Sequence, residues 1–316
     1  MTSPQCPQCD TTYQIGDRFC EECGTPLANI DGCKKCGAAT TQIDADGFCS
    51  NCGFRREKRE NDRFEIIVSS KLAGMSDRGL RHHQNEDFVA CAEVDGGYVM
   101  VVCDGVSSSE SPELASKAAA NAVCMGIKED GTTKGTKDTK ELMRGAIAKA
   151  MAVVSAIDYK PMKGGEAPST TVVAAVVVDG IATIGWMGDS RAYWISPNGS
   201  RQLTVDDSWF NDVVSSGEMS EMEARKSPNA HAITRWLGAD AVDIQPSVIE
   251  FQIPGSGYLL LCSDGLWNYA ENVAQMEAVV KENVCADIRM LALGLVEYAL
   301  KRGGHDNITV AILDCG

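Results

Sequence analysis

Four aspartates stand where an apolar, strand-like run of this chain meets a tight turn. Asp104 and Asp264 each follow such a run directly. Asp189 closes a third run, and Asp306 opens the last one. Strand ends that are far apart in sequence can converge in space, and carboxylates gathered there repel one another unless cations lie between them. Because hard divalent metals prefer oxygen ligands, the pattern predicts a site for more than one such cation.

Two of these aspartates also allow a simpler interpretation. Asp-Gly is a common hairpin turn signal, so Asp104-Gly105 and Asp264-Gly265 would each close a turn. That interpretation weakens when the surrounding motifs are considered together in chain order. They are Ser76-Asp77-Arg78-Gly79-Leu80, Asn85-Glu86-Asp87, Asp104-Gly105-Val106, Gly188-Asp189-Ser190-Arg191-Ala192-Tyr193, Ser263-Asp264-Gly265-Leu266-Trp267 and Asp306-Asn307-Ile308-Thr309-Val310.

In this order the motifs closely resemble the type 2C metal-dependent serine/threonine phosphatases, the PPM family, over about residues 64–315. The resemblance implies an α+β fold, a four-layer α-β-β-α sandwich of two antiparallel sheets flanked by helix pairs, with metals at one end. We expect residues 1–53 to form a small double zinc ribbon, 54–63 a charged linker and 64–316 the phosphatase domain. Within that domain, the alternation over residues 64–73 predicts one strand.

The resemblance also implies a metal site in which Asp104 bridges two cations and the Gly105 carbonyl binds one of them. The resemblance implies two to three ions, and an all-oxygen ligand set favours Mn²⁺ or Mg²⁺. The other implied ligands are Asp264 and Asp306 for one metal, Glu86 or Asp87 for the second, directly or through water, and Asp189 with Asp264 for a third, weaker site of bacterial-type members.

The implied reaction is hydrolysis of phosphoserine and phosphothreonine on proteins, without a phosphoenzyme. Phosphate monoesters hydrolyse extremely slowly, and hydroxide is scarce at pH 7. A water held between two cations loses its proton far more readily than bulk water and attacks phosphorus in line. The residues implied in catalysis are Arg81, Asp104, Asp264 and Asp306.

The sequence departs from the family at two positions. Bacterial-type members carry a phosphate-gripping arginine where this chain has His82. Arg81 is therefore the first candidate for that role and Arg78 the second. Some members carry a proton-donating histidine where this chain has Val106, so His82, His83 or a metal-bound water would protonate the leaving group.

The N-terminal segment contains eight of the fourteen cysteines, arranged as four Cys-x-x-Cys pairs. Two such pairs give a closed tetrahedral thiolate site, the structural form for zinc. Zinc binding, worth about 10–16 kcal/mol in small fingers, would supply the folding energy that the few apolar residues cannot. The segment resembles a double zinc ribbon with two Zn²⁺ ions, one held by Cys6, Cys9, Cys20 and Cys23 and the other by Cys33, Cys36, Cys49 and Cys52.

Charge and hydropathy narrow the set of partners. The net charge of −15 disfavours a phosphate backbone as partner, and the ribbon has seven acidic residues against three basic ones. This balance favours a module that docks proteins over one that binds nucleic acid. As partners, the family resemblance implies phosphoprotein substrates and a Ser/Thr kinase or its targets. The sequence has neither a signal peptide nor an apolar run of about 18 residues, so we expect a cytoplasmic monomer with no membrane contact.

Two alternatives to an active phosphatase remain at this point. One is a catalytically weak, phosphatase-like signalling scaffold that acts through the ribbon, although all the core carboxylates are present. The other is a nucleic-acid-binding ribbon protein, which a salt-dependent binding assay would reveal.

Overall fold

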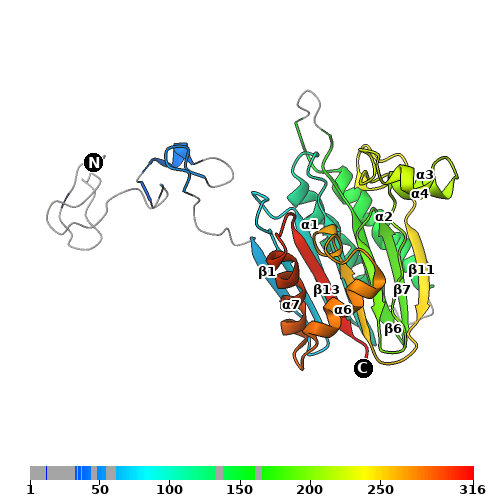
Figure 1. Cartoon of the computed structure of the whole chain (residues 1–316). Helices are drawn as coiled ribbons and strands as arrows, with labels where there is room; N and C mark the ends of the chain where they lie inside the picture. The colour runs from blue at the N-terminus through cyan, green and yellow to red at the C-terminus, as the bar shows by residue number, and fades with distance from the viewer. Residues whose placement is uncertain are drawn as a thin grey trace. The chain divides into compact units, whose positions relative to one another are not determined.

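The computed structural model divides the chain into two compact units, Met1–Arg59 and Glu60–Gly316 (Figure 1). The structure describes residues 12, 33, 35–36, 38–43, 48–54, 62–131, 138–160 and 166–316. The described part of the first unit contains a short 3-10 helix, η1 (Thr40–Gln42), and a bridge between Ile43 and Cys49.

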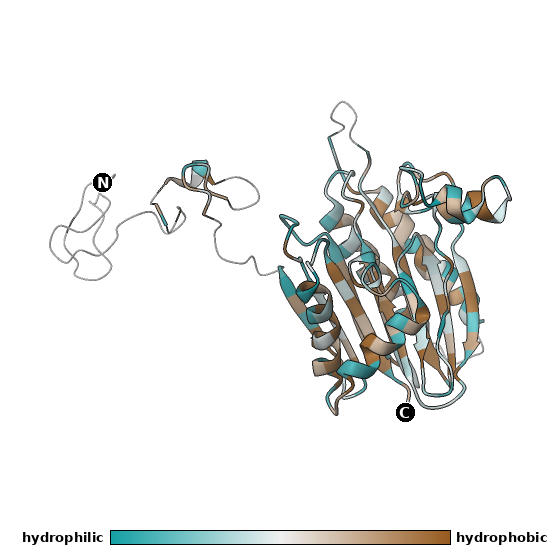
Figure 2. Cartoon of the chain, viewed as in Figure 1, coloured by the Kyte–Doolittle hydropathy of each residue, from teal (hydrophilic) through white to brown (hydrophobic). Residues whose placement is uncertain are grey.

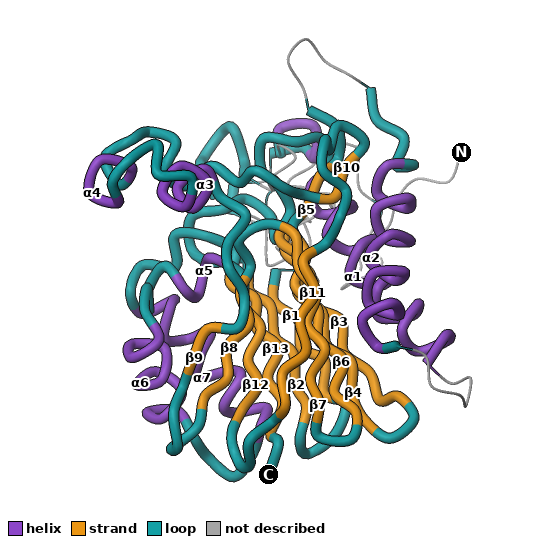
Figure 3. The backbone as a smooth tube through the Cα atoms, turned by 90° about the vertical axis from the view of Figure 1, so that its right-hand side faces the viewer, coloured by secondary structure: helices purple, strands orange, loops and turns teal. Residues whose placement is uncertain are grey.

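The second unit is built on two antiparallel sheets. The six-stranded sheet has the order β1-β2-β13-β12-β8-β9, and the five-stranded sheet has the order β11-β7-β6-β4-β3. A separate pair, β10-β5, lies beyond the strand ends in Figure 3. The strands are β1 (Arg63–Ile67), β2 (Leu72–Asp77), β3 (Asp87–Val94), β4 (Gly97–Asp104), β5 (Ser169–Thr170), β6 (Val172–Val178), β7 (Ile181–Met187), β8 (Arg191–Ile195), β9 (Arg201–Gln202), β10 (Leu237–Gly238), β11 (Ser247–Gln252), β12 (Tyr258–Cys262) and β13 (Ile308–Asp314).

Helices cover the outer faces of the two sheets (Figure 3). One buried cluster joins α1 and α2 to the five-stranded sheet, and another joins α6 and α7 to the six-stranded sheet. The expected pair of antiparallel sheets with flanking helices is therefore confirmed. The helices are α1 (Pro112–Gly131), α2 (Thr139–Ser155), α3 (Trp209–Ser215), α4 (Glu221–Ala224), α5 (Asp264–Trp267), α6 (Val273–Asn283) and α7 (Ile288–Lys301).

A third core lies between the two sheets, and side-chain alternation along the strands creates it. In β12, Leu259 and Leu261 face this inter-sheet core, whereas Leu260 faces the core shared with α6 and α7. Strands buried on both faces are therefore continuously apolar, which appears as brown along the central strands in Figure 2. Burial on both faces makes the positions of the strand ends rigid.

The prediction of one strand over residues 64–73 is wrong, because the chain turns between β1 and β2. The hydroxyl of Ser69 accepts a hydrogen bond from the Lys71 backbone N–H at 3.2 Å, and the Val68 N–H donates to the Leu72 carbonyl at 3.1 Å. The signal was the Ser69-Ser70 pair, since serine hydroxyls stabilise turns by bonding to nearby backbone groups. The two strands then pair with each other, from Arg63 opposite Asp77 onward.

No helix among the described residues is both long enough and apolar enough to cross a membrane.

We predict that Leu259→Ala lowers the free energy of unfolding of the second unit by about 2–5 kcal/mol, because it opens a cavity in the inter-sheet core. Leu259 is fully buried, whereas Val242 is 97% exposed, so Val242→Ala serves as the control and should change stability by less than about 0.5 kcal/mol. All five tryptophans lie between residues 186 and 267, so tryptophan fluorescence during urea unfolding reports on this unit alone. A cost below 1 kcal/mol for Leu259→Ala would contradict the described packing.

Candidate active site

Antiparallel pairing brings the predicted carboxylates to one end of both sheets. In the five-stranded sheet, Asp104 at the end of β4 lies opposite Asp87 at the start of β3. In the six-stranded sheet, β12 runs antiparallel to β13, so Asp264 after one strand and Asp306 before the other lie at the same end. Asp189 follows the end of β7 in the first sheet.

Asp104, Asp189, Asp264 and Asp306 line a cavity of about 170 Å³. Five of the predicted metal ligands line it, and they come from segments spread over about 200 residues of sequence. Glu86 and Asp87 stand beside it. The lining residues are Asp104, Gly105, Val106, Ser107, Thr171, Asp189, His231, Ile233, Asp264 and Asp306.

Neither Asp-Gly pair at the cavity closes a hairpin. Asp104 ends β4, and Asp264 begins the short helix α5. The glycines permit close backbone approach: a Cβ at Gly105 would lie 2.7 Å from the Glu86 carbonyl oxygen, and one at Gly265 would lie 1.8 Å from that of Asn307. The turn interpretation is therefore wrong, and both glycines allow neighbouring segments to meet at the site.

The carboxylates of the cavity are held in an unfavourable environment for negative charge. Burial raises the pKa of Asp104 and that of Asp264 well above the usual range, and the charges of the neighbouring carboxylates raise both further. Burial also raises the pKa of Asp189, to about 7, with the charge of Asp206 adding to it. Bound cations would relieve this repulsion, so the electrostatics fit a metal site.

Asp87 provides a second test of whether cations fit here. Its side chain is 3% exposed, and burial raises its pKa to about 7. Its Oδ2 accepts a hydrogen bond from the Ser263 hydroxyl at 2.7 Å, whereas its buried Oδ1 has no hydrogen-bond partner among the described residues. A buried carboxylate oxygen without a donor is a suitable position for a cation or its water ligand.

Hydroxyl and amide side chains that the sequence analysis did not single out position the site. Thr171 Oγ1 accepts from the Asp104 backbone N–H at 3.1 Å and lies 2.9 Å from Ser190 Oγ. Asn307 accepts from the Glu86 N–H at 2.7 Å through its Oδ1. Its Nδ2 donates to the carbonyl of Arg78 at 2.8 Å, which connects the loop after β2 to the start of β13. Of these side chains, only Asn307 and Ser190 belong to the motifs that resemble the phosphatase family. The motifs do not show which residues Asn307 and Ser190 contact.

The two arginines predicted to bind phosphate, and the histidine predicted to protonate the leaving group, have different surroundings. Arg78 lies 3.3 Å from Asp62 through its Nε and donates to the His82 carbonyl. Arg81 is exposed to solvent. His82 places its Nε2 3.1 Å from Asp306 Oδ1, which brings an imidazole directly against one of the predicted metal ligands.

A larger cavity of about 590 Å³ adjoins the first one and shares Asp189 and His231 with it. Residues of α3, residues of the segment after α4 and Trp267 of α5 are among those that line it. Arg191 donates to Asp206 through Nε and NH2, and its guanidinium lies 3.7 Å from the centre of the Trp267 ring. The acidic centre therefore opens beside a roomier pocket with aromatic and basic side chains.

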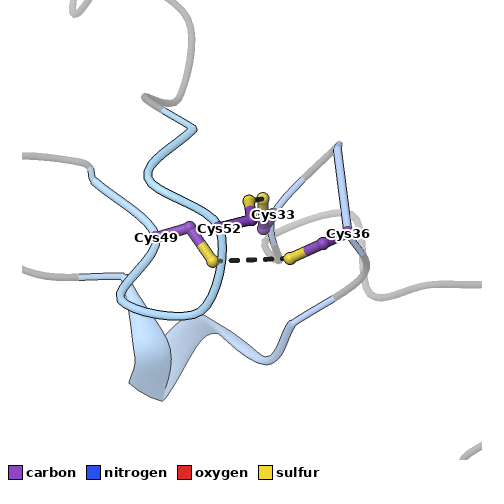
Figure 4. Close-up of side chains that lie close together, drawn as sticks. All are labelled: Cys33, Cys36, Cys49 and Cys52. Atoms are coloured by element: carbon purple, nitrogen blue, oxygen red, sulfur yellow. Dashed lines mark hydrogen bonds between the residues drawn. The ribbon is translucent and has the colours of Figure 1, made fainter.

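A different donor set occurs in the first unit, where four cysteines converge (Figure 4). The sulfur atoms of Cys33, Cys36, Cys49 and Cys52 all lie within 4.8 Å of one another, as the pair spacing predicts. They are the one group of this kind found among the described residues. The Ala38 backbone and the Asn51 side chain hydrogen-bond to Cys36 and lower its pKa to about 6, which favours the thiolate that binds zinc. The other predicted set, Cys6, Cys9, Cys20 and Cys23, lies outside the described residues.

We predict that Mn²⁺ stabilises the second unit more at pH 8 than at pH 5.5. The folded-state pKa values of Asp87 and Asp189, about 7, lie above the unfolded value of 3.8. Without cations, their contribution to stability is therefore present below about pH 4 and is lost as the pH rises through 7. Because Mn²⁺ binds the charged carboxylates, the difference in Tm between Mn²⁺ and EDTA should grow by about 5 °C or more over this range.

Tryptophan fluorescence during heating measures this difference. Asp264→Asn removes one of the repelling charges, so it should raise the Tm in EDTA at pH 8 and reduce the gain from Mn²⁺. A Mn²⁺ effect that does not change with pH would contradict the electrostatic description of the cavity.

Comparison with known proteins agrees with this geometry. Residues 80–286 match the family model described as Protein phosphatase 2C, and residues 6–53 match that described as Double zinc ribbon. The chain is 29% identical over 246 residues to the serine/threonine phosphatase stp of Listeria monocytogenes, covering 76% of this chain and 93% of the relative. It is 28% identical to the serine/threonine protein phosphatase PstP of Mycobacterium tuberculosis over 79% of this chain and 46% of PstP.

Solved structures show the same fold. The serine/threonine phosphatase Stp1 from Staphylococcus aureus superposes with a TM-score of 0.65 at 25% identity, covering 83% of this chain and 100% of Stp1. The catalytic domain of PstP in complex with two manganese ions gives a TM-score of 0.63 at 25% identity, covering 80% of this chain and 98% of that domain.

Proposed function

The chain belongs to the protein phosphatase 2C family, and on this basis we propose that it hydrolyses phosphoserine and phosphothreonine in proteins with Mn²⁺ or Mg²⁺ as cofactor. The observation that carries the proposal is the convergence of Asp104, Asp189, Asp264 and Asp306 on one cavity. An acidic cavity would repel a phosphorylated substrate unless cations reversed its charge. The relatives are named as serine/threonine phosphatases, and one of the similar structures contains manganese.

Each residue of the cavity takes a role that its position supports. Asp104, at the junction of Asp87 and Asp264, would bridge two cations, with the Gly105 carbonyl as a further ligand. Asp264 and Asp306 would be further ligands of one cation, and Glu86 or Asp87 would bind the second. Asp189 would bind a third. Bound divalent cations supply an acidic water as nucleophile and neutralise charge on the phosphoryl oxygens. The rigid strand ends keep the carboxylates in place while the phosphate approaches.

Phosphate recognition needs a cation from the chain itself, and Arg81 is the best candidate. Arg78 is already engaged by Asp62, whereas the exposed Arg81 keeps its guanidinium available for two oxygens of a phosphate. His82 instead contacts Asp306 and would help to hold that carboxylate. The larger adjoining cavity would take the polypeptide on either side of the phosphorylated residue.

The N-terminal unit would bind two structural zinc ions and dock protein partners. The thiolate cluster of Cys33, Cys36, Cys49 and Cys52 supports one ion directly, and the repeated spacing supports the other. We propose phosphoproteins, including a Ser/Thr kinase or its targets, as the partners of a monomeric, cytoplasmic enzyme. The excess of acidic residues in the ribbon argues against nucleic acid.

We predict that phosphate release from a phosphothreonine peptide requires Mn²⁺ or Mg²⁺, stops in EDTA, and falls at least about 100-fold in Asp104→Asn. Loss of the bridging carboxylate removes several kcal/mol of charge stabilisation, and 1.36 kcal/mol corresponds to a factor of ten. The same substitution at the exposed turn residue Asp95, between β3 and β4, is the matched control and should leave the rate unchanged. Full activity in EDTA or in Asp104→Asn, with circular dichroism showing an intact fold, would refute the mechanism.

We predict two zinc ions per chain by elemental analysis and one in Cys36→Ser, because the remaining three thiolates no longer close the tetrahedral site. Cys285→Ser is the control, since Cys285 is an exposed cysteine of the other unit, and it should retain both ions. Hydrolysis of the phosphothreonine peptide should survive Cys36→Ser, because none of the proposed hydrolytic residues lies in the ribbon. Two ions in Cys36→Ser would show that this cluster is not a zinc site.

A further inference from the structure

Three successive serines follow the Asp104-Gly105-Val106 motif, and each makes a different hydrogen bond. The buried Ser109 accepts from the Ser169 N–H at 3.2 Å, which fixes the turn to the strand β5. Ser108 is exposed and donates to Glu166 Oε2 at 2.7 Å. Ser107 is also exposed, lines the acidic cavity and donates to Glu86 Oε2 at 2.5 Å.

The backbone of Glu86 has little freedom to move toward a cation, because both its N–H and its carbonyl are hydrogen-bonded. Its N–H donates to Asn307 Oδ1 at 2.7 Å. Its carbonyl accepts from the Gly105 N–H at 3.1 Å and from the Ser116 hydroxyl at 2.5 Å. Only the side-chain torsions of Glu86 therefore remain to direct its carboxylate, and a glutamate in a half-exposed position has many rotamers to choose from.

The Glu86 carboxylate accepts hydrogen bonds of different strength from Ser107 and Gln84. The Ser107 hydroxyl bonds to Oε2 at 2.5 Å, a short distance typical of a hydrogen bond to a charged acceptor. Gln84 Nε2 lies 3.4 Å from Oε1 and shares its protons with Glu113 Oε2 at 3.2 Å. Ser107 is therefore the stronger of the two contacts, and a carboxylate that accepts one such bond keeps lone pairs free for a cation.

We propose that Ser107 is a positioning residue for the metal site: its hydroxyl sets the direction of the Glu86 carboxylate toward the cavity and so raises the affinity for the second divalent cation. The inference rests on the proposed function of this cavity, and it assigns the second cation to Glu86. A carboxylate that is already oriented loses less side-chain freedom on binding, so the effect appears as affinity and not as a new contact with substrate.

Ser108 supplies an internal comparison for this inference. It stands next to Ser107, is also exposed and also donates to a glutamate, but Ser108 is not among the residues lining the cavity, whereas Ser107 is. Its partner Glu166 instead pairs with Ser109 in an isolated bridge. A general effect of removing a serine hydroxyl from this turn would therefore appear in both Ser107→Ala and Ser108→Ala. An effect through Glu86 would appear only in the first.

The experiment is a Mn²⁺ titration of the full, zinc-loaded chain by isothermal titration calorimetry, alongside hydrolysis of a phosphothreonine peptide as a function of Mn²⁺ concentration. We expect Ser107→Ala to weaken one class of Mn²⁺ site about tenfold, within the range found for residues that orient metal ligands. The Mn²⁺ concentration for half-maximal activity should rise by the same factor, with most of the rate recovered at saturating Mn²⁺. Ser107→Thr, which keeps the hydroxyl, should bind nearly as the wild type does, and Ser108→Ala should be unchanged.

Glu86→Gln completes the test, because Ser107→Ala should add no further loss of Mn²⁺ affinity in that background. Equal losses in Ser107→Ala and Ser108→Ala, additive losses with Glu86→Gln, or wild-type affinity in Ser107→Ala would each overturn the inference. A wild-type chain that binds Mn²⁺ in the cavity without hydrolysing the peptide would overturn the proposed function but leave the affinity comparison decisive for Ser107. A wild-type chain that binds no Mn²⁺ there would overturn both.

Discussion

Repulsion among the carboxylates of one small cavity is the constraint on which the rest of the structure depends. Asp104 at a strand end and Asp264 at a helix start have little freedom to move away from their neighbours, and Asp306 lies two residues before β13. Such a cluster opposes folding, because each carboxylate is most stable when solvated and apart from like charges. The three apolar cores of the second unit supply the stability that holds it together, and cations would turn the unfavourable contact into a binding site.

Antiparallel pairing is the means by which distant residues reach this cavity. Asp104 ends a strand of one sheet, Asp264 follows a strand of the other, and each sheet places the start of a neighbouring strand beside that end. A shift of one residue in either ladder would point the side chains of that strand to the opposite face. The register is set by strands buried on both faces, so the inter-sheet core and the metal geometry depend on the same residues, such as Leu259 and Leu261.

Sequence reasoning found the parts of this arrangement that have a local signature. Apolar runs that end in aspartate predicted the strand ends, and pairs of cysteines separated by two residues predicted the cluster of Cys33, Cys36, Cys49 and Cys52. It failed where a turn had only a weak signal, as at Ser69. It could not identify the hydroxyls of Thr171, Ser263 and Ser107 as parts of the site, because their partners are remote in sequence and serine and threonine are common in every environment. The proximity of His82 to Asp306, 224 residues later, is likewise a property of the fold and not of any motif.

The two metal-binding arrangements differ in both donor chemistry and geometry, and this difference would keep their metals apart. Four thiolates within 4.8 Å of one another leave room for a single tetrahedral ion, and soft sulfur donors favour zinc. The carboxylates instead spread around a cavity of about 170 Å³, which suits hard cations that share ligands and retain water. Zinc binds many oxygen and nitrogen sites more tightly than Mn²⁺ does, so an oxygen site alone would not exclude it. The thiolates of the ribbon would hold zinc far more strongly than the carboxylates do, and hydroxyls such as those of Ser263 and Ser107 orient the carboxylates of the oxygen site. One chain would then use zinc for folding and reserve the weaker-binding cation for hydrolysis.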